Sequence, residues 1–413
     1  MSNVWSNNKR ELNLDYLTKY IDSKSFDFKK MKDEMDLKIV NDEKQKYYSL
    51  KYNKNSINKN TIKTLGIFRS VILRKNDLVC FSPIKSLHET LFFETNNLKN
   101  IVCEEFVEGT MINCFYDKEE RDWIISTRSV VGANTSFSKD TKKTFKEMFD
   151  EAFTNMKLTW DMFNREYVYT FVLQHPENKI VLTIEEPILY LVEVFKIDNF
   201  NIQLINYREK ECLVQLLKHI KTPDLYNINK MSYDEIKHKY ASMNTDYNCL
   251  GIMFKNGFER CKIRNPSYEY LHNLKGNNPK LQYQYYNLRQ NNQVKEFLKH
   301  YPKYKEYFSV LREELHRETV TLWKNYISCF VKHNQPLEKY GYQYRPHMIE
   351  LHKKYINELL EHKRYVTKQT VINYINELPV PRLMHFMNYK IKQKILVESN
   401  SSFKKTQLQE ISN

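Results

Sequence analysis

The chain has 413 residues, of which 41% are hydrophobic and 14% aromatic, so it can form the cores of two or three domains and is not disordered as a whole. Its 65 Lys and Arg exceed its 50 Asp and Glu by 15, which favours a polyanionic partner as much as it favours a merely lysine-rich surface. The seven cysteines form no C-x-x-C pair and no apolar run approaches the roughly 20 residues of a membrane helix, so we expect an intracellular protein without a zinc ribbon or membrane insertion.

The predicted elements divide the chain into three parts. Residues 1–60 are polar and lysine-rich, and we expect a loose N-terminal extension. From 61 to 275 the sequence predicts a domain with both strands and helices. Short runs of β-branched and aromatic residues predict strands at 66–73, 78–81, 100–106, 110–116, 123–127, 168–173, 179–184, 188–194, 249–254 and 258–264. Helical spacing of apolar residues predicts helices at 141–155 and near 210–220.

From 276 to 413 the pattern predicts a helical C-terminal domain. Apolar residues at steps of three and four predict helices at 294–300 and 307–333. Pro346 stands where the first turn of another helix would begin, and Thr367 is a plausible N-cap for the next one. Pro379 and Pro381 are expected to end that helix.

Glycine is scarce, with seven in the whole chain, so each one is expected to answer a backbone requirement. Gly109 follows Glu108 between two predicted strands. Taken alone, this pair is typical of a hairpin turn. The neighbouring residues change that interpretation, because the pair is one of seven short segments that occur in a fixed order: Arg69-Ser-Val-Ile72, Pro83-Ile-Lys85, Phe106-Val-Glu-Gly-Thr110, Thr127-Arg-Ser129, Phe171 through Val181, Leu250-Gly251 and Lys262-Ile-Arg264.

The order, spacing and flanking strands of these segments, over residues 64–275, resemble the tRNA-repair type of phage RNA ligase and the ligase-like proteins of large DNA viruses. The resemblance implies an α+β fold, with an ATP-grasp-like nucleotidyltransferase domain of two antiparallel sheets flanking a groove and a helical C-terminal domain. It also implies that Arg69, Lys85, Arg128, Lys262 and Arg264 hold phosphates, and that Glu108 and Gly109 belong to the nucleotide site. The segment from Leu351 to Tyr389 resembles the domain appended in the viral members.

The same resemblance argues against ligation. The position of the lysine that forms a covalent lysyl–AMP is occupied by Phe106, which has no nucleophilic atom. The positions of metal-binding carboxylates are occupied by Val172 and Leu250, which cannot ligate a hard cation. Lys99 and Lys118 are too far along the chain to substitute. We therefore predict no catalytic residue and no metal site.

The sequence leads to three hypotheses. The first is a catalytically degenerate RNA ligase-like protein that needs no cofactor and binds RNA, another polyanion or a nucleotide. It would act in the host cytoplasm, or as a virion component with viral protein partners. The second is an active ligase that uses ATP and magnesium with an unorthodox nucleophile. The third is a structural scaffold without a ligand. The first is favoured over the third if Arg69, Arg128, Lys262 and Arg264 converge on one open groove.

Two other groups of residues are interpreted as structural. Glu104 and Glu105 are adjacent in a predicted strand, so they point to opposite faces and are expected to be surface charge partners. His347 and His352 are five residues apart, a spacing that does not bring two side chains to one helix face, so a metal site is disfavoured.

Overall fold

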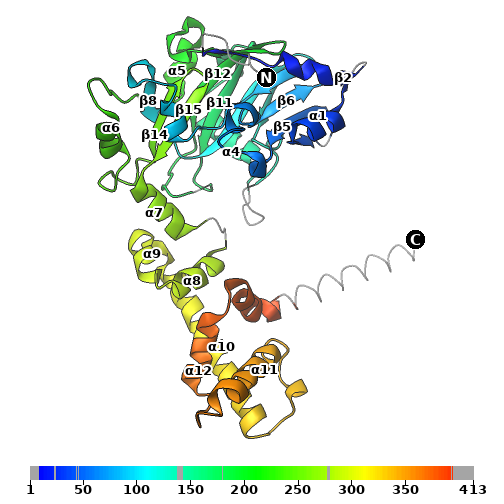
Figure 1. Ribbon diagram of the computed structural model, residues 1–413, viewed down its shortest axis with the longest axis vertical. Helices are drawn as coiled ribbons and strands as arrows, with labels where there is room; N and C mark the ends of the chain where they lie inside the picture. Colours follow the sequence, from blue (N-terminus) through cyan, green and yellow to red (C-terminus); the bar gives the residue numbers. More distant parts are fainter. Residues whose placement is uncertain are drawn as a thin grey trace. The chain divides into compact units, whose positions relative to one another are not determined.

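The computed structural model describes residues 9–22, 25–42, 44, 46–136, 143–178, 180–276, 280–391 and 393. The chain divides into two compact units, Met1–His272 and Asn273–Asn413, and each is described by itself (Figure 1). This division falls close to the predicted boundary at residue 275. The named strands all lie in the first unit, and the named elements of the second are helical, so the predicted α+β class with antiparallel sheets and C-terminal helices is confirmed.

The largest sheet of the first unit has six antiparallel strands in the order β1-β13-β12-β11-β9-β10. Helix α4 (Phe145–Asn155) packs its buried Phe145, Met148 and Phe149 against this sheet. A capping box between Thr144 and Glu147 fixes where the helix begins. The strand bounds are β1 Glu11–Asn13, β9 Thr110–Asp117, β10 Asp122–Ser126, β11 Tyr167–Gln174, β12 Ile188–Asp198 and β13 Asn201–Ile205.

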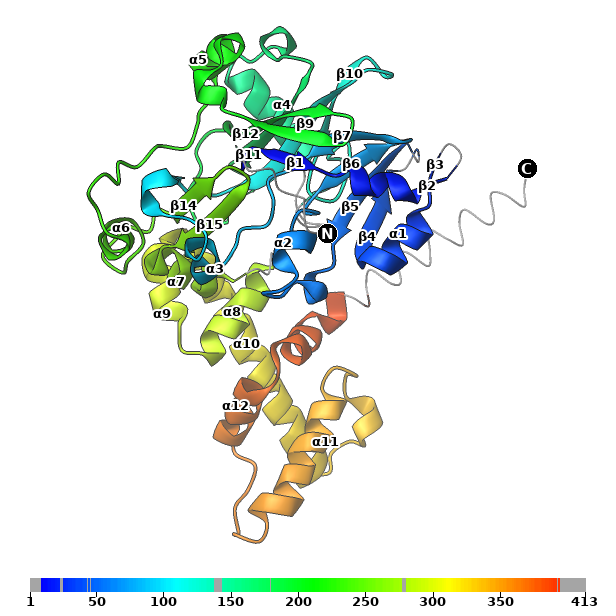
Figure 2. The same ribbon diagram turned by 45° about the horizontal axis from the view of Figure 1, so that its top comes forward.

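Two smaller antiparallel sheets and a two-stranded ribbon complete the unit. Figure 2 shows α1 (Phe28–Met35) beside β4 and α3 (Glu89–Phe93) beside β15. The sheet β4-β5-β6-β7 comprises Leu37–Asn41, Tyr47–Tyr52, Val71–Arg74 and Asp77–Phe81. The sheet β15-β14-β8 comprises Glu259–Arg264, Gly251–Asn256 and Val102–Glu105. The ribbon pairs β2 (Ile21–Asp22) with β3 (Ser25–Phe26).

The remaining elements of this unit are short connections. The α-helices are α2 Ile62–Leu65, α5 Val214–His219 and α6 Tyr233–Tyr240, while α7 Pro266–Lys275 crosses the division between the units. Turns of 3-10 helix occur at Asp15–Tyr20, Lys54–Ser56, Leu98–Asn100, Trp160–Met162, Tyr207–Glu209 and Glu211–Leu213.

The predicted loose N-terminal extension differs from the structure, because residues 9–60 belong to the first unit wherever they are described. Leu12, Leu14 and Leu17 are fully buried, and Met31 and Leu50 join the same core cluster. The apolar side chains in this segment are few and lie between lysines, so the local sequence shows little periodicity. Pairing of β1 with β13 and of β5 with β6 supplies the partners that bury them.

The segment around Lys9 also links two sheets through its contacts. The carbonyl of Lys9 accepts a hydrogen bond of 2.9 Å from the Phe258 amide, and the Lys9 ammonium lies 2.9 Å from Glu259. Gly257 has φ +59°, and a Cβ there would lie 1.9 Å from the Lys9 carbonyl oxygen. A glycine is therefore required where the turn between β14 and β15 meets the segment before β1.

The second unit contains α8 Leu281–Gln290, α9 Val294–His300, α10 Lys305–Tyr326, α11 Arg345–Lys354 and α12 Lys368–Glu377. It also has 3-10 turns at Pro302–Tyr304 and Leu337–Lys339 and π-helical turns at Ile327–Val331 and Tyr355–Leu359. Pro346 lies in the first turn of α11 and Thr367 caps α12, as predicted. α12 ends at Glu377, just before Pro379, as predicted, but Pro381 lies in the first turn of a further helical stretch over 380–391.

None of the described helices combines the length and apolarity needed to cross a membrane. The two histidines considered for a metal are held by other contacts. His347 is buried and lies 2.7 Å from the Tyr374 hydroxyl, and His352 stacks on Phe330 with ring centroids 4.1 Å apart.

Candidate functional site

A cavity of about 300 Å³ in the first unit lies at the open end of β8 and β9, between β11 on one side and β14 and β15 on the other. We call it the cationic groove. It brings together most of the residues that the sequence singled out. Those that line it are Arg69, Glu104, Glu105, Phe106, Glu108, Gly109, Val172, Leu250, Lys262 and Arg264.

The cations of the groove come mainly from β15. Arg260, Lys262 and Arg264 alternate along this strand, so their side chains share one face. Pairing with β14 fixes their register, with Arg260 opposite Lys255, Lys262 opposite Met253 and Arg264 opposite Gly251. Arg260 was missed from the sequence, although the alternation in Glu259-Arg-Cys-Lys-Ile-Arg264 carries the signal.

Two cations that line the groove, Arg69 and Lys262, have no ion-pair partner among the residues that the structure describes. Neither the Arg69 guanidinium nor the Lys262 ammonium forms an ion pair, whereas Arg260 lies 3.2 Å from Glu193 and Arg264 pairs with Glu269. Burial, followed by repulsion from Arg260, lowers the pKa of Arg69 to about 10. Loss of surrounding water, followed by repulsion from Arg264 and Arg69, lowers the pKa of Lys262 to about 8. An anion bound in the groove would favour the charged forms of both side chains and so raise both pKa values.

Apolar side chains form the rest of the lining. The Lys262 ammonium lies 5.5 Å from the centroid of the Phe106 ring, and the Phe106 amide donates a hydrogen bond of 3.2 Å to the Gly251 carbonyl. Val172 and Leu250 line the same space. They do not close it, so the groove offers a cationic side for phosphate and an apolar side for a base or sugar.

The Glu108 carboxylate is already hydrogen-bonded to groups of the same chain. Its carboxylate accepts hydrogen bonds from the backbone amides of Val181 and Leu182, at 3.1–3.4 Å, and from the Tyr268 hydroxyl at 2.5 Å. The predicted strand at 179–184 is wrong for its described residues, because residues 180–185 are bends and coil. Two of their amides bond to this carboxylate instead of to a neighbouring strand.

Magnesium, which the ligase resemblance implies, does not fit the donors of this groove. Glu108 is committed to two amides and a hydroxyl, and the positions of the family carboxylates are apolar. No group of three or more His, Cys, Asp or Glu residues suited to a metal ion occurs within the described ranges. Cationic side chains, rather than a metal held by carboxylates, would therefore balance the charge of a bound phosphate here.

Glu104 and Glu105 both line the groove, and Glu104, predicted to be a surface residue, is only 4% exposed and takes part in an ion-pair network in the groove wall. Its carboxylate lies 2.5 Å from the Lys255 ammonium, which is also 3.4 Å from Glu193. Burial alone would lower the pKa of Lys255, but the two carboxylates raise it. The prediction failed because Lys255 is far along the chain and reaches Glu104 through the pairing of β8 with β14.

Arg128 and Lys85 lie outside the groove lining, beside Arg69. The Arg128 guanidinium lies 4.6 Å from the centroid of the Tyr52 ring, and the Lys85 ammonium lies 5.9 Å from it. Arg128 also donates from Nε to the Arg69 carbonyl oxygen at 3.2 Å. Arg69, Lys262 and Arg264 therefore line one groove, as expected. Arg128 does not line it and lies beside Arg69 instead.

Gly109 is required by close packing of two strands. Its φ is +151°, and a Cβ there would lie 2.5 Å from the Leu173 carbonyl oxygen and 2.6 Å from Val172 Cγ1. The glycine lets the chain pass against β11 immediately before β9 begins. It shapes the wall of the groove rather than a hairpin turn.

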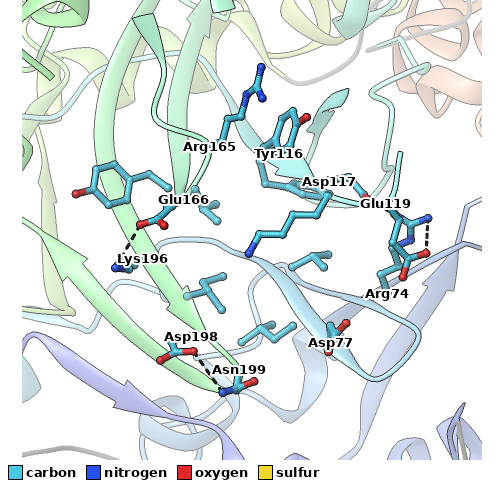
Figure 3. Close-up of a pocket in the computed structure, with 17 residues that line it drawn as sticks. Arg74, Asp77, Tyr116, Asp117, Glu119, Arg165, Glu166, Lys196, Asp198 and Asn199 are labelled. Carbon is cyan, nitrogen blue, oxygen red and sulfur yellow. Dashed lines mark hydrogen bonds and ion pairs between the residues drawn. The ribbon is translucent and has the colours of Figure 1, made fainter. Parts of the chain in front are cut away.

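A larger cavity of about 530 Å³ lies elsewhere in the first unit, where the ends of β7, β9, β11 and β12 meet (Figure 3). We call it the mixed-charge cavity. Figure 3 shows Arg74 facing Glu119 and Lys196 facing Glu166, at 3.2 and 3.4 Å. Arg165 lies over the Tyr116 ring at 4.7 Å. Five carboxylates line this cavity against four cations, whereas five cations line the cationic groove against three carboxylates, so this cavity offers less to an added anion than the groove does.

No protein-family model matches the chain. An RNA ligase of Rhodothermus phage RM378 is 24% identical to it over 202 residues, which cover 41% of this chain and 45% of the phage protein, so the match spans less than half of that relative. A Naegleria gruberi RNA ligase variant solved with ATP and manganese is 12% identical, with a TM-score of 0.34 over 52% of this chain and 66% of that one. A putative ATP-dependent DNA ligase from Aquifex aeolicus is 13% identical, with a TM-score of 0.38 over 80% of this chain and 79% of that one. The sequence match confirms the predicted resemblance to RNA ligases.

Proposed function

We propose that this chain, which is RNA ligase-like in sequence and fold, binds RNA or a nucleotide in its cationic groove without forming a covalent lysyl–AMP. The observation that carries the proposal is the pair of unpartnered cations, Arg69 and Lys262, which face the same cavity as Phe106. Guanidinium and ammonium groups bind phosphate through charge and geometry alone, so this function does not need the missing nucleophile.

The fold stabilises this arrangement at several points. Glu108 anchors the segment at Val181 and the Tyr268 ring, and Glu104 with Glu193 neutralises the buried Lys255. Of the three carboxylates that line the groove, Glu104 and Glu108 are engaged with other groups, and Glu105 forms no ion pair with a described residue. Among the cations that line it, Arg69 and Lys262 have no ion pair within the described residues, and a phosphate would sit beside them.

The proposal is tested by equilibrium binding of a labelled, 5′-phosphorylated single-stranded RNA at several salt concentrations. Charge reversal by Lys262→Glu with Arg264→Glu is expected to weaken binding and flatten its dependence on salt, because phosphate contacts release counterions. The matched control is Lys75→Glu with Lys196→Glu, whose lysines pair with Glu119 and Glu166. Equal binding by wild type and the groove variant would contradict the proposal and favour a scaffold without a ligand.

A second candidate function rests on Lys262 itself. Its lowered pKa, about 8, leaves an appreciable fraction of neutral amine at neutral pH, and its ammonium lies beside the ring at the family's nucleophile position. In an active ligase, this amine would attack the α-phosphorus of ATP and form a P–N bond. The bond from the α-phosphorus to the bridging oxygen would break, pyrophosphate would leave, and the amine proton would pass to water.

The two functions separate on incubation with α-labelled ATP and magnesium followed by denaturing electrophoresis. Label on the wild type that is lost in Lys262→Ala would establish the ligase-type function. No label on the wild type is the result expected for the binding protein. A Phe106→Lys variant tests the groove further, since label on this variant alone would show that only the nucleophile has been lost.

A further inference from the structure

We infer that a single-stranded RNA continues out of the cationic groove, past the Tyr52 ring and onto β4 and β5, along a track of cations formed by Arg128, Lys85, Lys54, Lys51 and Lys38. This inference rests on the proposed function and extends it, because it assigns a surface outside the groove and a polynucleotide rather than a mononucleotide as the ligand. We call these five residues the cation track.

The first step of the track is physically joined to the groove. Arg69 lines the groove, and its carbonyl oxygen accepts a hydrogen bond from Arg128 Nε at 3.2 Å. Arg128 and Lys85 lie over the same Tyr52 ring, at 4.6 and 5.9 Å from its centroid. Tyr52 is only 7% exposed, so it supports the two cations rather than offering a surface for a stacked base. The positive charge therefore continues from Arg69 to the surface without interruption.

The second step lies on the sheet. Lys38 of β4 is directly opposite Lys51 of β5 in the strand register. Like charges at directly opposite positions in an antiparallel pair are unfavourable, and the structure gives neither lysine an ion pair with a described acid. Burial, followed by repulsion from Arg128 and Lys38, lowers the pKa of Lys51. Burial, followed by Arg69, Arg128 and Lys54, lowers that of Lys85.

Two other lysines of the same sheet, Lys46 and Lys75, are compensated. Lys46, just before β5, lies 2.8 Å from Glu120, and Lys75, just after β6, lies 2.9 Å from Glu119. None of the five cations of the track has such a partner within the described part of the chain. These two compensated lysines lie at the other end of the sheet, and the cations of the track lie at the end near the groove. A ligand that carries its own regularly spaced negative charges would supply the missing partners.

A single-stranded RNA fits these features better than other polyanions. A cavity of about 300 Å³ with an apolar side admits a nucleotide but not a duplex. A phosphodiester chain that leaves it presents one negative charge per nucleotide, and sites for single strands typically span about 4–16 nucleotides. A mononucleotide in the groove would not reach Lys38 or Lys51. The track therefore predicts that affinity increases with the length of the RNA.

The experiment compares binding of AMP with binding of a labelled single-stranded RNA of about 12 nucleotides, a length within the usual range of site sizes. The variant Lys38→Gln with Lys51→Gln is expected to bind the RNA about tenfold more weakly. The slope of log affinity against log salt should fall by about 1.4, or about 0.7 for each lost phosphate contact. Its affinity for AMP should be unchanged. Its thermal stability should rise, because the opposed charges of the two lysines are gone.

The matched control is Lys46→Gln with Lys75→Gln, which removes the same charge from the other end of the sheet. An equal loss of RNA affinity in this control would overturn the track, because bulk charge would then suffice. Unchanged RNA binding in Lys38→Gln with Lys51→Gln would also overturn it. Wild-type binding of AMP without any gain for the longer RNA would refute the track while leaving the proposed function intact. Absence of AMP binding, with RNA binding that depends on Lys38 and Lys51, would refute the groove instead.

A further arm uses vesicles that contain phosphatidylserine. Binding that competes with RNA and is lost in the same variant would identify a lipid surface as the partner and overturn the assignment to RNA. Vesicles that neither bind nor compete are the expected result, because the track is continuous with a cavity of nucleotide size.

Discussion

The mixed-charge cavity and the cationic groove, two cavities of the first unit, contain similar side chains but differ in their balance of charge. The mixed-charge cavity is the larger, about 530 Å³ against about 300 Å³, and its Arg74 and Lys196 each face a carboxylate. In the cationic groove, Arg69 and Lys262 form no ion pair with a described acid, and loss of surrounding water and repulsion lower the pKa of each. Three carboxylates line the groove against five in the mixed-charge cavity, so the balance of charge, rather than volume, distinguishes the site that suits an anion.

The largest effect should come from removing Arg69. We expect Arg69→Ala to weaken binding of a phosphate ligand about 10- to 100-fold, because hydrogen bonds to charged groups each contribute about 1.5–3 kcal/mol. Arg165→Ala, in the mixed-charge cavity, removes the same charge and should leave affinity nearly unchanged. Isothermal titration with AMP measures both. Comparable losses in the two variants would remove the distinction between the cavities.

The next largest effect should be a loss of stability on altering the buried Glu108 carboxylate in the groove wall. Glu108→Gln is expected to lower the free energy of unfolding by about 2 kcal/mol, since the new amide group cannot accept from Val181, Leu182 and the Tyr268 hydroxyl together. Asp198→Asn, at the rim of the mixed-charge cavity, should have little effect. Urea unfolding of both variants gives the comparison. A near-zero change for Glu108→Gln would show that the carboxylate is not the anchor described.

The dependence of stability on pH isolates Lys262. Its pKa is about 8 in the folded chain against an ordinary 10.5, so between these values the unfolded chain binds more protons and stability should rise with pH. Lys262→Met keeps a flexible, unbranched side chain and removes the charge. Below pH 8 the variant should be more stable by of order 1 kcal/mol, since solvent and salt screen the repulsion at this exposed side chain. Thermal melts of both proteins from pH 7 to 10.5 should converge as pH rises, and a variant less stable at pH 7 would be evidence against the repulsion.

The smallest effect belongs to the exposed ion pairs of the mixed-charge cavity. Lys196→Gln breaks the contact between Lys196 and Glu166, whose side chains are 45% and 64% exposed, respectively. Exposed pairs contribute about 0.2–1 kcal/mol, so the change in unfolding free energy should be near the lower limit and the affinity for RNA should not change. A measurable loss of RNA affinity in this variant would assign a binding role to the larger cavity as well.

The sequence predicted the parts of the fold and site that depend on local pattern. The resemblance singled out Lys262 and Arg264, and runs of β-branched and aromatic residues located most strands from 66 to 264. The parts that failed depend on partners far along the chain. Glu104 is buried because Lys255 meets it, and the amides of Val181 and Leu182 turn toward Glu108 instead of joining a strand. Arg128 lies over the Tyr52 ring, a contact that no local pattern predicted.

Strand β1 limits how far this chain can be shortened from its N-terminal side. β1 pairs with β13 over Glu11 to Asn13 and so covers one edge of the six-stranded sheet. Without it, β13 would present a row of unpaired amides and carbonyls, a template on which a second molecule can add a strand. A truncated chain that begins after Leu14 would therefore be prone to self-association, and the N-terminal strand protects solubility as much as it contributes to the core.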